Sequence, residues 1–227
     1  IKAIFHFGEF ARIHQSFNNF NKCLDSNING TRSIINFCQK NNIRLIYSAT
    51  SATLGNNGAD KNLSPYAFSK SHNLELLENM KKWFNFKFEI VYFYNVYGPR
   101  HIEKGEMATV IGVFENQYKN SKPLTVVRPG SQSRRFTHVF DTVKICYEAF
   151  VANKCCHYSI FHKKSYSIIE VAKMFKSKIK YIDPRLGERN SSAIVSKSLN
   201  NKIIKRYGKI KLKDYINSSI KGLNYEN

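Results

Sequence analysis

The first hundred residues alternate short apolar segments with longer segments of helical spacing, and this alternation restricts the folds open to the chain. The segments AIFHFG (residues 3–8), IRLIYSAT (43–50) and FEIVYFYNVYG (88–98) are apolar over most of their length. Apolar runs of this length are typical of parallel strands that are covered on both faces. The order strand, helix, strand, helix, strand therefore predicts an α/β fold, with helices packed on the faces of a parallel sheet.

Two helices are expected between these three strands. The first carries an apolar stripe spaced by three or four residues, made of Leu24, Ile28, Thr31, Ile35 and Cys38. A polar loop then leads to the second helix, where Ser64 is a good cap and Pro65 suits the first turn. The apolar side chains expected to point inward from this helix are Leu74, Leu77 and Met80.

Beyond Arg100 the pattern is less regular. Short helical and extended segments follow one another and end in two expected helices, which predicts a smaller α+β lobe. We expect the sheet domain to comprise residues 1–100, with residues 135–152 returning to it. The remaining residues, 101–134 and 153–227, are expected to form the lobe that binds substrate.

Composition excludes several classes of protein. The 227 residues are 42% hydrophobic, which is enough for a substantial core, and no apolar run approaches the roughly 20 residues of a membrane helix. We expect a soluble, cytoplasmic protein without a membrane partner. The net charge of +20 would suit nucleic acid, but the lysines are scattered along the chain, so no nucleic-acid partner is expected and a phosphate-bearing substrate is favoured. Neither the cysteines nor the histidines have metal-ligand spacing, so no metal site is expected.

The segment SPYAFSK (residues 64–70) places Tyr66 and Lys70 four residues apart, on one face of the second helix. A tyrosine with a pKa of about 10 is a poor base at neutral pH, but a neighbouring cation favours the phenolate. Taken alone, this spacing is more often an exposed helix face. The position of the Tyr66–Lys70 pair favours a catalytic role. The preceding strand ends in the hydroxyls of Ser48, Thr50 and Ser51, at the sheet edge where ligands bind.

Five segments together resemble the extended short-chain dehydrogenase/reductase family, in particular nucleotide-sugar epimerases of the UDP-glucose 4-epimerase type. They are NINGT, YSATSATLG, SPYAFSK, YNVYGPR and GSQSRRFTHVFD, which stand in the family's order and spacing over nearly the whole chain. The resemblance implies a Rossmann-like domain, NAD as cofactor, a nucleotide-diphosphate sugar as substrate and a homodimer at full length. It also implies epimerisation, expected at C4 of a UDP-hexose, through a transient keto-sugar.

Other activities remain open alongside this one. A reductase or a heptose epimerase of the same family is possible on this pattern, as is a non-catalytic Rossmann-like protein that binds nucleotides. The intact set of Thr50, Tyr66 and Lys70 argues against a protein that has lost turnover.

The resemblance also assigns roles to single residues. It implies that Tyr66 is the base, that Lys70 supports it and holds the nicotinamide ribose, and that Thr50 hydrogen-bonds the sugar hydroxyl. The further cofactor contacts that it implies are Gly8, Asn27, Ser48 and Phe93. The substrate contacts that it implies are Ser51, Asn95, Arg134, Arg185 and Glu188. Arginine suits a diphosphate because its guanidinium is a rigid fork of donors, although each arginine could equally be a solvated surface charge.

Three features depart from the family pattern. No segment matches the glycine-rich turn G-x-x-G-x-x-G that holds the NAD pyrophosphate, and the chain begins where the family's fourth strand would lie. We therefore expect a truncated sequence that lacks roughly the first 60 to 70 residues. Arg135 stands where relatives carry an acidic residue, and Glu9 stands where small residues line the cofactor. The sequence assigns neither of these two residues a role.

Overall fold

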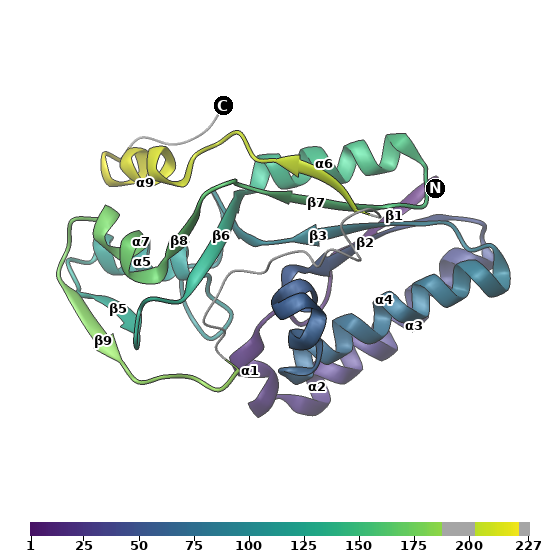
Figure 1. The fold of residues 1–227 in the computed structure, drawn as a ribbon, viewed down its shortest axis with the longest axis horizontal. Coiled ribbons are helices and arrows are strands. Elements are labelled where there is room, and N and C mark those ends of the chain that lie inside the picture. The colour runs from purple at the N-terminus through teal and green to yellow at the C-terminus, as the bar shows by residue number, and fades with distance from the viewer. Residues whose placement is uncertain (188–202, 223–227) are drawn as a thin grey trace. The chain divides into compact units, whose positions relative to one another are not determined.

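The computed structural model describes residues 1–187 and 203–222 and is drawn in Figure 1. These residues form two compact units, each described here by itself. The first unit comprises Ile1–Phe93, Val143–Ile160 and residues 203–206, and the second comprises Tyr94–Thr142 and residues 161–187 and 207–222. Within the described ranges, no helix has both the length and the apolar character needed to cross a membrane.

A five-stranded sheet forms the centre of the first unit. Its order is β1 (Ala3–His6), β2 (Arg44–Thr50), β3 (Phe88–Phe93), β7 (His157–Phe161) and β10 (Ile203–Tyr207). The pairs β1–β2, β2–β3 and β3–β7 are parallel. The middle strands β2 and β3 are buried along nearly their whole length, as expected for parallel strands covered on both faces. The predicted α/β fold with a parallel sheet is confirmed.

Helices cover both faces of this sheet. Figure 1 shows α6 (Val139–Ala152) on one face and α3 (Gly30–Lys40) and α4 (Pro65–Phe84) on the other. The side facing α6 is an apolar core that includes Ile46, Val91, Ile145, Ala149 and Tyr158. On the other side, α1 (Ile13–Asn18) and α2 (Phe20–Leu24) pack against α4.

The start of α4 follows the sequence prediction. The Ser64 hydroxyl accepts a hydrogen bond of 3.1 Å from the backbone N–H of Ala67, and Pro65 occupies the first turn. Leu77 and Met80 are buried as expected, and Leu74 is partly buried. The segment before α4, Ser51–Asn62, is a 3₁₀ helix where a polar loop was expected.

The expected apolar stripe of the first helix is only partly correct. Thr31, Ile35 and Cys38 are buried, but Leu24 and Ile28 are partly exposed and Cys23 and Asn27 lie inside instead. The reason is a π-helical turn over Asp25–Asn29, between α2 and α3. A π turn contains about one residue more than an α turn, so it rotates the preceding side chains by one position.

The third expected strand is in fact two strands. β3 ends at Phe93, and β4 (Asn95–Tyr97) pairs in parallel with β6 (Ser133–His138) in the second unit. The prediction of one strand over residues 88–98 was wrong because an apolar run does not show where the chain changes its partner strand. Asn95 stabilises the pairing of β4 with β6, since its side-chain amide donates a 3.0 Å hydrogen bond to the Arg135 carbonyl.

The second unit is a mixture of short strands and helices. Its strands form a three-stranded sheet, β4–β6–β8 (Ser165–Ser167), and a parallel pair, β5 (Leu124–Val127) with β9 (Ile179–Ile182). Its helices include α5 (Val110–Lys119), α7 (Ile168–Met174) and α9 (Leu212–Ile220). Of the two helices expected at the C-terminus, α9 lies in the described part of the chain. Strand β10 was not expected from the sequence.

Candidate active site

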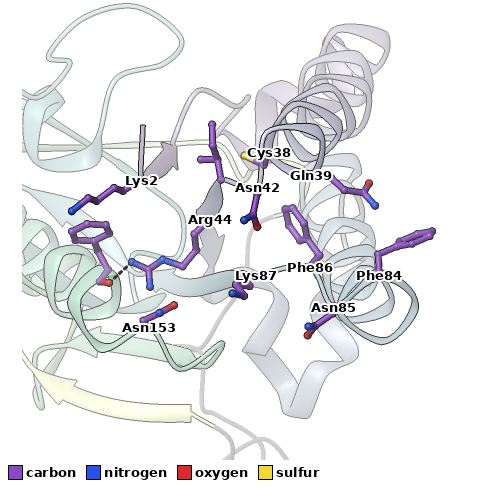
Figure 2. Close-up of a pocket in the computed structure, with 12 residues that line it drawn as sticks. Lys2, Cys38, Gln39, Asn42, Arg44, Phe84, Asn85, Phe86, Lys87 and Asn153 are labelled. Carbon is purple, nitrogen blue, oxygen red and sulfur yellow. Dashed lines mark hydrogen bonds between the residues drawn. The ribbon is translucent and has the colours of Figure 1, made fainter.

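One cavity of the first unit lies at the amino ends of the strands and measures about 340 Å³ (Figure 2). Its cations are Lys2, Arg44 and Lys87, and α3, α4 and α6 all end beside it. Arg44 donates to the Phe150 carbonyl and lies 4.9 Å from the centre of the Phe150 ring. Cations at helix C-termini stabilise the helix dipoles, and the described lining residues include no carboxylate or histidine. This cavity is therefore a poor candidate for acid–base chemistry.

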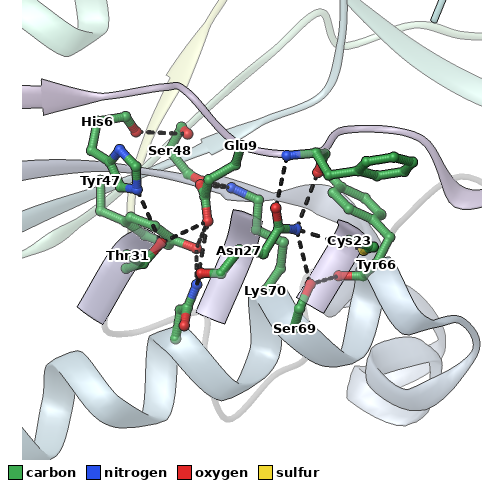
Figure 3. A network of polar contacts seen from close by, with 12 residues as sticks. His6, Glu9, Cys23, Asn27, Thr31, Tyr47, Ser48, Tyr66, Ser69 and Lys70 are labelled. Atoms are coloured by element: carbon green, nitrogen blue, oxygen red, sulfur yellow. Dashed lines mark hydrogen bonds and ion pairs between the residues drawn. The ribbon is translucent and has the colours of Figure 1, made fainter. Parts of the chain in front are cut away.

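A polar network at the opposite edge, beyond the carboxyl ends of β1 and β2, has the groups that the cavity lacks (Figure 3). Glu9 follows β1, Ser48 lies near the end of β2, and the first turns of α4 bring Tyr66 and Lys70. This is the edge where parallel sheets bind their ligands.

Lys70 is the cation at the centre of this network. It is only 3% exposed, and its Nζ donates a 2.6 Å hydrogen bond to the Ser48 carbonyl and forms an ion pair with Glu9. The ammonium also lies 4.8 Å from the centre of the Tyr47 ring. Burial lowers the pKa of Lys70 below its ordinary value, and the Glu9 carboxylate opposes this shift.

Glu9 is satisfied from several elements at once. Its side chain is 1% exposed, and its Oε2 binds Lys70. Its Oε1 accepts hydrogen bonds from the hydroxyls of Thr31 and Tyr47, each 3.0 Å long, and from the Asn73 amide at 3.3 Å. A buried carboxylate is costly unless it is paired and hydrogen-bonded, and here both conditions hold.

Asn27 joins the loop after β1 to helix α4. Its Oδ1 accepts a 2.7 Å hydrogen bond from the Phe10 N–H, and its Nδ2 donates to the Phe10 carbonyl and, at 2.9 Å, to the Ser69 hydroxyl. Ser69 in turn donates to the Tyr66 carbonyl. The π-helical turn places Asn27 inside the protein, so this residue fixes the backbone on both sides of the network.

The other predicted catalytic residues are buried at the same edge. Tyr66 is 9% exposed, one turn before Lys70 on α4, while Thr50 ends β2 and is followed by the buried Ser51. Thr50 also accepts a 3.2 Å hydrogen bond from the Ala52 N–H. A second cation belongs to this region: burial lowers the pKa of Arg12, and Tyr66 acts in the opposite direction.

Sequence reasoning left out three partners of Glu9, namely Thr31, Tyr47 and Asn73. A signal for Asn73 was present, because it continues the buried face of α4 that runs through Tyr66, Lys70 and Leu77. A polar residue on an otherwise buried helix face needs a partner. No comparable signal marked Tyr47, which reads as an ordinary residue of a buried strand.

Of the residues expected to bind substrate, Ser51 belongs to the first unit, and Asn95, Arg134 and Arg185 belong to the second. Arg134 is 9% exposed on β6, and its guanidinium donates a 2.9 Å hydrogen bond to the Ser133 carbonyl. Asn95 lies on the paired strand β4, so these two residues are close in the sheet. Arg185 is exposed, and Glu188 lies outside the described residues. Arg135, which departs from the family pattern, packs its guanidinium 4.6 Å from the centre of the Phe161 ring.

Sequence reasoning did not identify one cluster of the second unit, because its three members follow no regular spacing. Ligand atoms of His101, Glu103 and Glu115 lie within 4.8 Å of one another. His101 pairs with Glu115 at 2.9 Å, and Glu103 pairs with Lys119 at 3.0 Å. Burial acts to raise the pKa of Glu115, but the hydrogen bonds from His101 and Ser219, together with the electrostatic effects of His101 and Lys119, outweigh burial and hold that pKa below its ordinary value. His101 and Lys119 are thus the ion-pair partners of the two carboxylates.

Comparison with known proteins adds to this geometry. Residues 1–160 match the model of the NAD dependent epimerase/dehydratase family. An ADP-L-glycero-D-manno-heptose-6-epimerase of Fusobacterium nucleatum is 30% identical over 192 residues, which are 76% of this chain and 57% of that protein. An uncharacterized UDP-glucose epimerase of Bacillus subtilis is 29% identical over 153 residues, 63% of this chain and 47% of that protein. The chain thus spans about half the length of these curated relatives.

Solved structures share the fold. A UDP-N-acetylglucosamine 4-epimerase from Methanobrevibacter ruminantium has a TM-score of 0.82 at 24% identity, covering 97% of this chain and 76% of that one. A UDP-glucuronic acid 4-epimerase from Bacillus cereus, solved with its substrate and NAD, has a TM-score of 0.83 at 21% identity, covering 97% and 74%. Because the family model matches well over half of the chain, including strands β1 to β3 and the whole polar network, the chain belongs to the NAD dependent epimerase/dehydratase family.

Proposed function

We propose that the protein containing this chain is an NAD-dependent nucleotide-sugar epimerase in which Tyr66 is the base and Lys70 its cationic partner. The observation that carries this proposal is their placement in the first two turns of α4, both buried, at the carboxyl edge of a parallel sheet. Lys70 is held there by the Ser48 carbonyl and by Glu9. A buried cation one helical turn from a tyrosine, on the same helix, favours the phenolate.

The residues at this edge fit the nicotinamide ribose end of NAD. Gly8 faces open space, since a side-chain carbon built there would meet no atom within 4 Å. Lys70 uses two of its three N–H donors on Ser48 and Glu9, which leaves one for a ribose hydroxyl. Phe93, at the end of β3, is partly exposed. Together with Asn27, Ser48 and Tyr66, these residues form the proposed cofactor contacts.

The proposed reaction needs a group that takes a proton from a sugar hydroxyl and later returns it. Bound NAD would supply hydride acceptance from the sugar carbon and hydride return to the opposite face, so the sugar is inverted with no net redox change. Tyr66, as the phenolate, removes the hydroxyl proton while the keto-sugar forms and gives it back when the keto group is reduced. Thr50, with Ser51 beside it, hydrogen-bonds the same hydroxyl.

We propose a UDP-hexose as substrate, with inversion at C4. The support is the set of structural neighbours that act on UDP-sugars together with Asn95, Arg134, Arg185 and Glu188 as the diphosphate and ribose contacts. A specific observation favours a second candidate, a heptose 6-epimerase, because two curated relatives that match more than three quarters of this chain carry that name. The two candidates share Tyr66 and Lys70 and differ in the sugar.

Turnover assays on the full-length protein separate these candidates. We expect interconversion of UDP-glucose and UDP-galactose, which is measured by chromatography of the products. Turnover of an ADP-heptose instead would favour the second candidate, and a product reduced at the expense of added NADH would indicate a reductase. Binding of both nucleotides without turnover of any sugar would support a non-catalytic nucleotide-binding protein and contradict the proposal.

We further propose that the full-length protein is a homodimer. The support is apolar surface on the outer side of the first unit: Phe68, Trp83 and Phe84 of α4 and Phe37 of α3 are each between 47% and 62% exposed. Such side chains are typical of a helical interface between copies. Light scattering of the purified protein tests this. The expected cytoplasmic location and the absence of a nucleic-acid partner stay predictions from the sequence.

A further inference from the structure

We propose that Glu9 is a positioning residue of this site, whose carboxylate holds the Lys70 ammonium in place and keeps it charged beside Tyr66. The inference rests on the proposed function, because Lys70 matters here as the partner of a catalytic tyrosine. It also gives a role to a buried carboxylate to which the sequence assigned none.

The Glu9 carboxylate is fixed in place by groups from several elements. Its Oε1 is used entirely on neutral donors from α3, β2 and α4, namely the groups of Thr31, Tyr47 and Asn73. Its Oε2 is left for Lys70. One oxygen thus anchors the carboxylate to three elements of the first unit, and the other binds the ammonium. Because the carboxylate cannot move freely, its Oε2 also fixes the position of the Lys70 ammonium.

Lys70 depends on Glu9 for its orientation. A lysine side chain has four rotatable bonds, and ordering such a chain costs free energy that its contacts must offset. The Ser48 carbonyl and Glu9 fix the ammonium from two sides, and the face of the Tyr47 ring lies 4.8 Å away. The remaining N–H donor is therefore held in one direction. Loss of Glu9 would free the ammonium to reorient around a single acceptor.

Glu9 also supports the positive charge of Lys70. The titratable groups around Lys70 come from four elements and the loop after β1: Glu9, His6, Cys23 and Tyr47, which interact with it, and Tyr66, which lies one turn earlier on α4. Of these five, Glu9 is the carboxylate. Burial favours the neutral amine, and the Glu9 charge is the largest influence that opposes it. With Glu9 made neutral, burial would prevail and Lys70 would lose its proton at a lower pH.

The sign of the effect on activity follows from Lys70. The active form has Tyr66 deprotonated and Lys70 protonated, so the loss of the Lys70 proton sets the upper limit of the active pH range. Glu9→Gln should therefore move that upper limit to lower pH. A different result is expected if Lys70 stays charged without Glu9 and the Glu9 charge only weakens the effect of Lys70 on Tyr66. Neutralising Glu9 would then favour the Tyr66 phenolate, so activity at low pH would rise and the upper pH limit would not fall.

The experiment uses the full-length protein with NAD and measures kcat between pH 6 and 10 for Glu9→Gln. We expect the upper pH limit to fall by about one unit or more, with KM for the sugar nucleotide changed less than about threefold. A second readout is independent of turnover: NMR of protein carrying ¹³C at the lysine Cε should show the Lys70 titration shifted in the same direction. Glu75→Gln is the matched control, because it neutralises an exposed carboxylate of the same helix α4; its upper limit should stay in place.

Glu9→Asp keeps the proposal testable if Glu9→Gln does not fold. Aspartate retains the charge but is one methylene shorter, so the Lys70 titration should stay near its original value while kcat falls about tenfold or more. An unchanged upper limit and an unchanged Lys70 titration in folded Glu9→Gln, or an unchanged kcat in Glu9→Asp, would overturn the role of Glu9. Failure of the proposed function looks different: either the original protein would turn over no sugar nucleotide, or Lys70→Met would keep the original turnover.

Discussion

His6 illustrates how much of this site depends on neutral buried groups. Its Nε2 lies 2.9 Å from the Thr31 hydroxyl, whose one proton is donated to Glu9. The hydroxyl must therefore accept from His6, which places the ring proton on Nε2. Burial lowers the pKa of His6, with a raising contribution from Glu9 and a lowering one from Lys70. The neutral ring is thus part of the folded network.

This histidine should make the protein acid-sensitive. Because the folded pKa of His6 is below its ordinary value of 6.5, the stability that it contributes is complete above pH 6.5 and is lost as the pH falls through the folded pKa. The melting temperature measured from pH 8 to pH 5 should fall less steeply in His6→Gln, whose amide can still donate to Thr31. The exposed His72→Gln is the control. Equal pH slopes in His6→Gln and the original protein would show that another group is responsible.

At the scale of elements, α4 carries both Tyr66 and Lys70, so its start determines where they lie. Ser64 is 4% exposed, and its hydroxyl caps the helix through the Ala67 N–H. Ser64→Ala should lower the free energy of unfolding by about 0.5–2 kcal/mol, the usual cost of losing an N-cap. Ser64→Gly is the comparison, since glycine in this position typically costs only a few tenths of a kcal/mol. Denaturant titration measures both, and equal losses in the two variants would argue against a capping role.

Elements were predictable from the sequence where local signals agree, and not where the chain changes its pairing. The cap at Ser64 and the apolar runs of β1 and β2 were found correctly. The π-helical turn of Asp25–Asn29 was missed, because helical spacing assumes one number of residues per turn throughout. That turn is what places Asn27 inside the protein, so the missed feature belongs to the site.

At the scale of the whole molecule, the fold class could be predicted from the periodicity of apolar residues, whereas the full set of contacts in the site could be identified only from the three-dimensional structure. Tyr66, Lys70 and Asn27 came from short motifs, but Glu9 had no assigned role until its four donors were seen together. Those donors lie between 22 and 64 residues away in sequence, and no spacing rule links them. Long-range polar networks of this kind are visible only once the strands and helices are assembled.

The central claim is that Tyr66 is the base, and Tyr66→Phe tests it most directly. In the full-length protein, epimerase turnover should fall by about two to four orders of magnitude, the usual contribution of a general base. The affinity for the sugar nucleotide, measured by calorimetry, should change little because the ring remains. Tyr147→Phe, on the exposed side of α6, is the matched control and should keep its turnover. A loss of less than about tenfold in Tyr66→Phe would contradict the account.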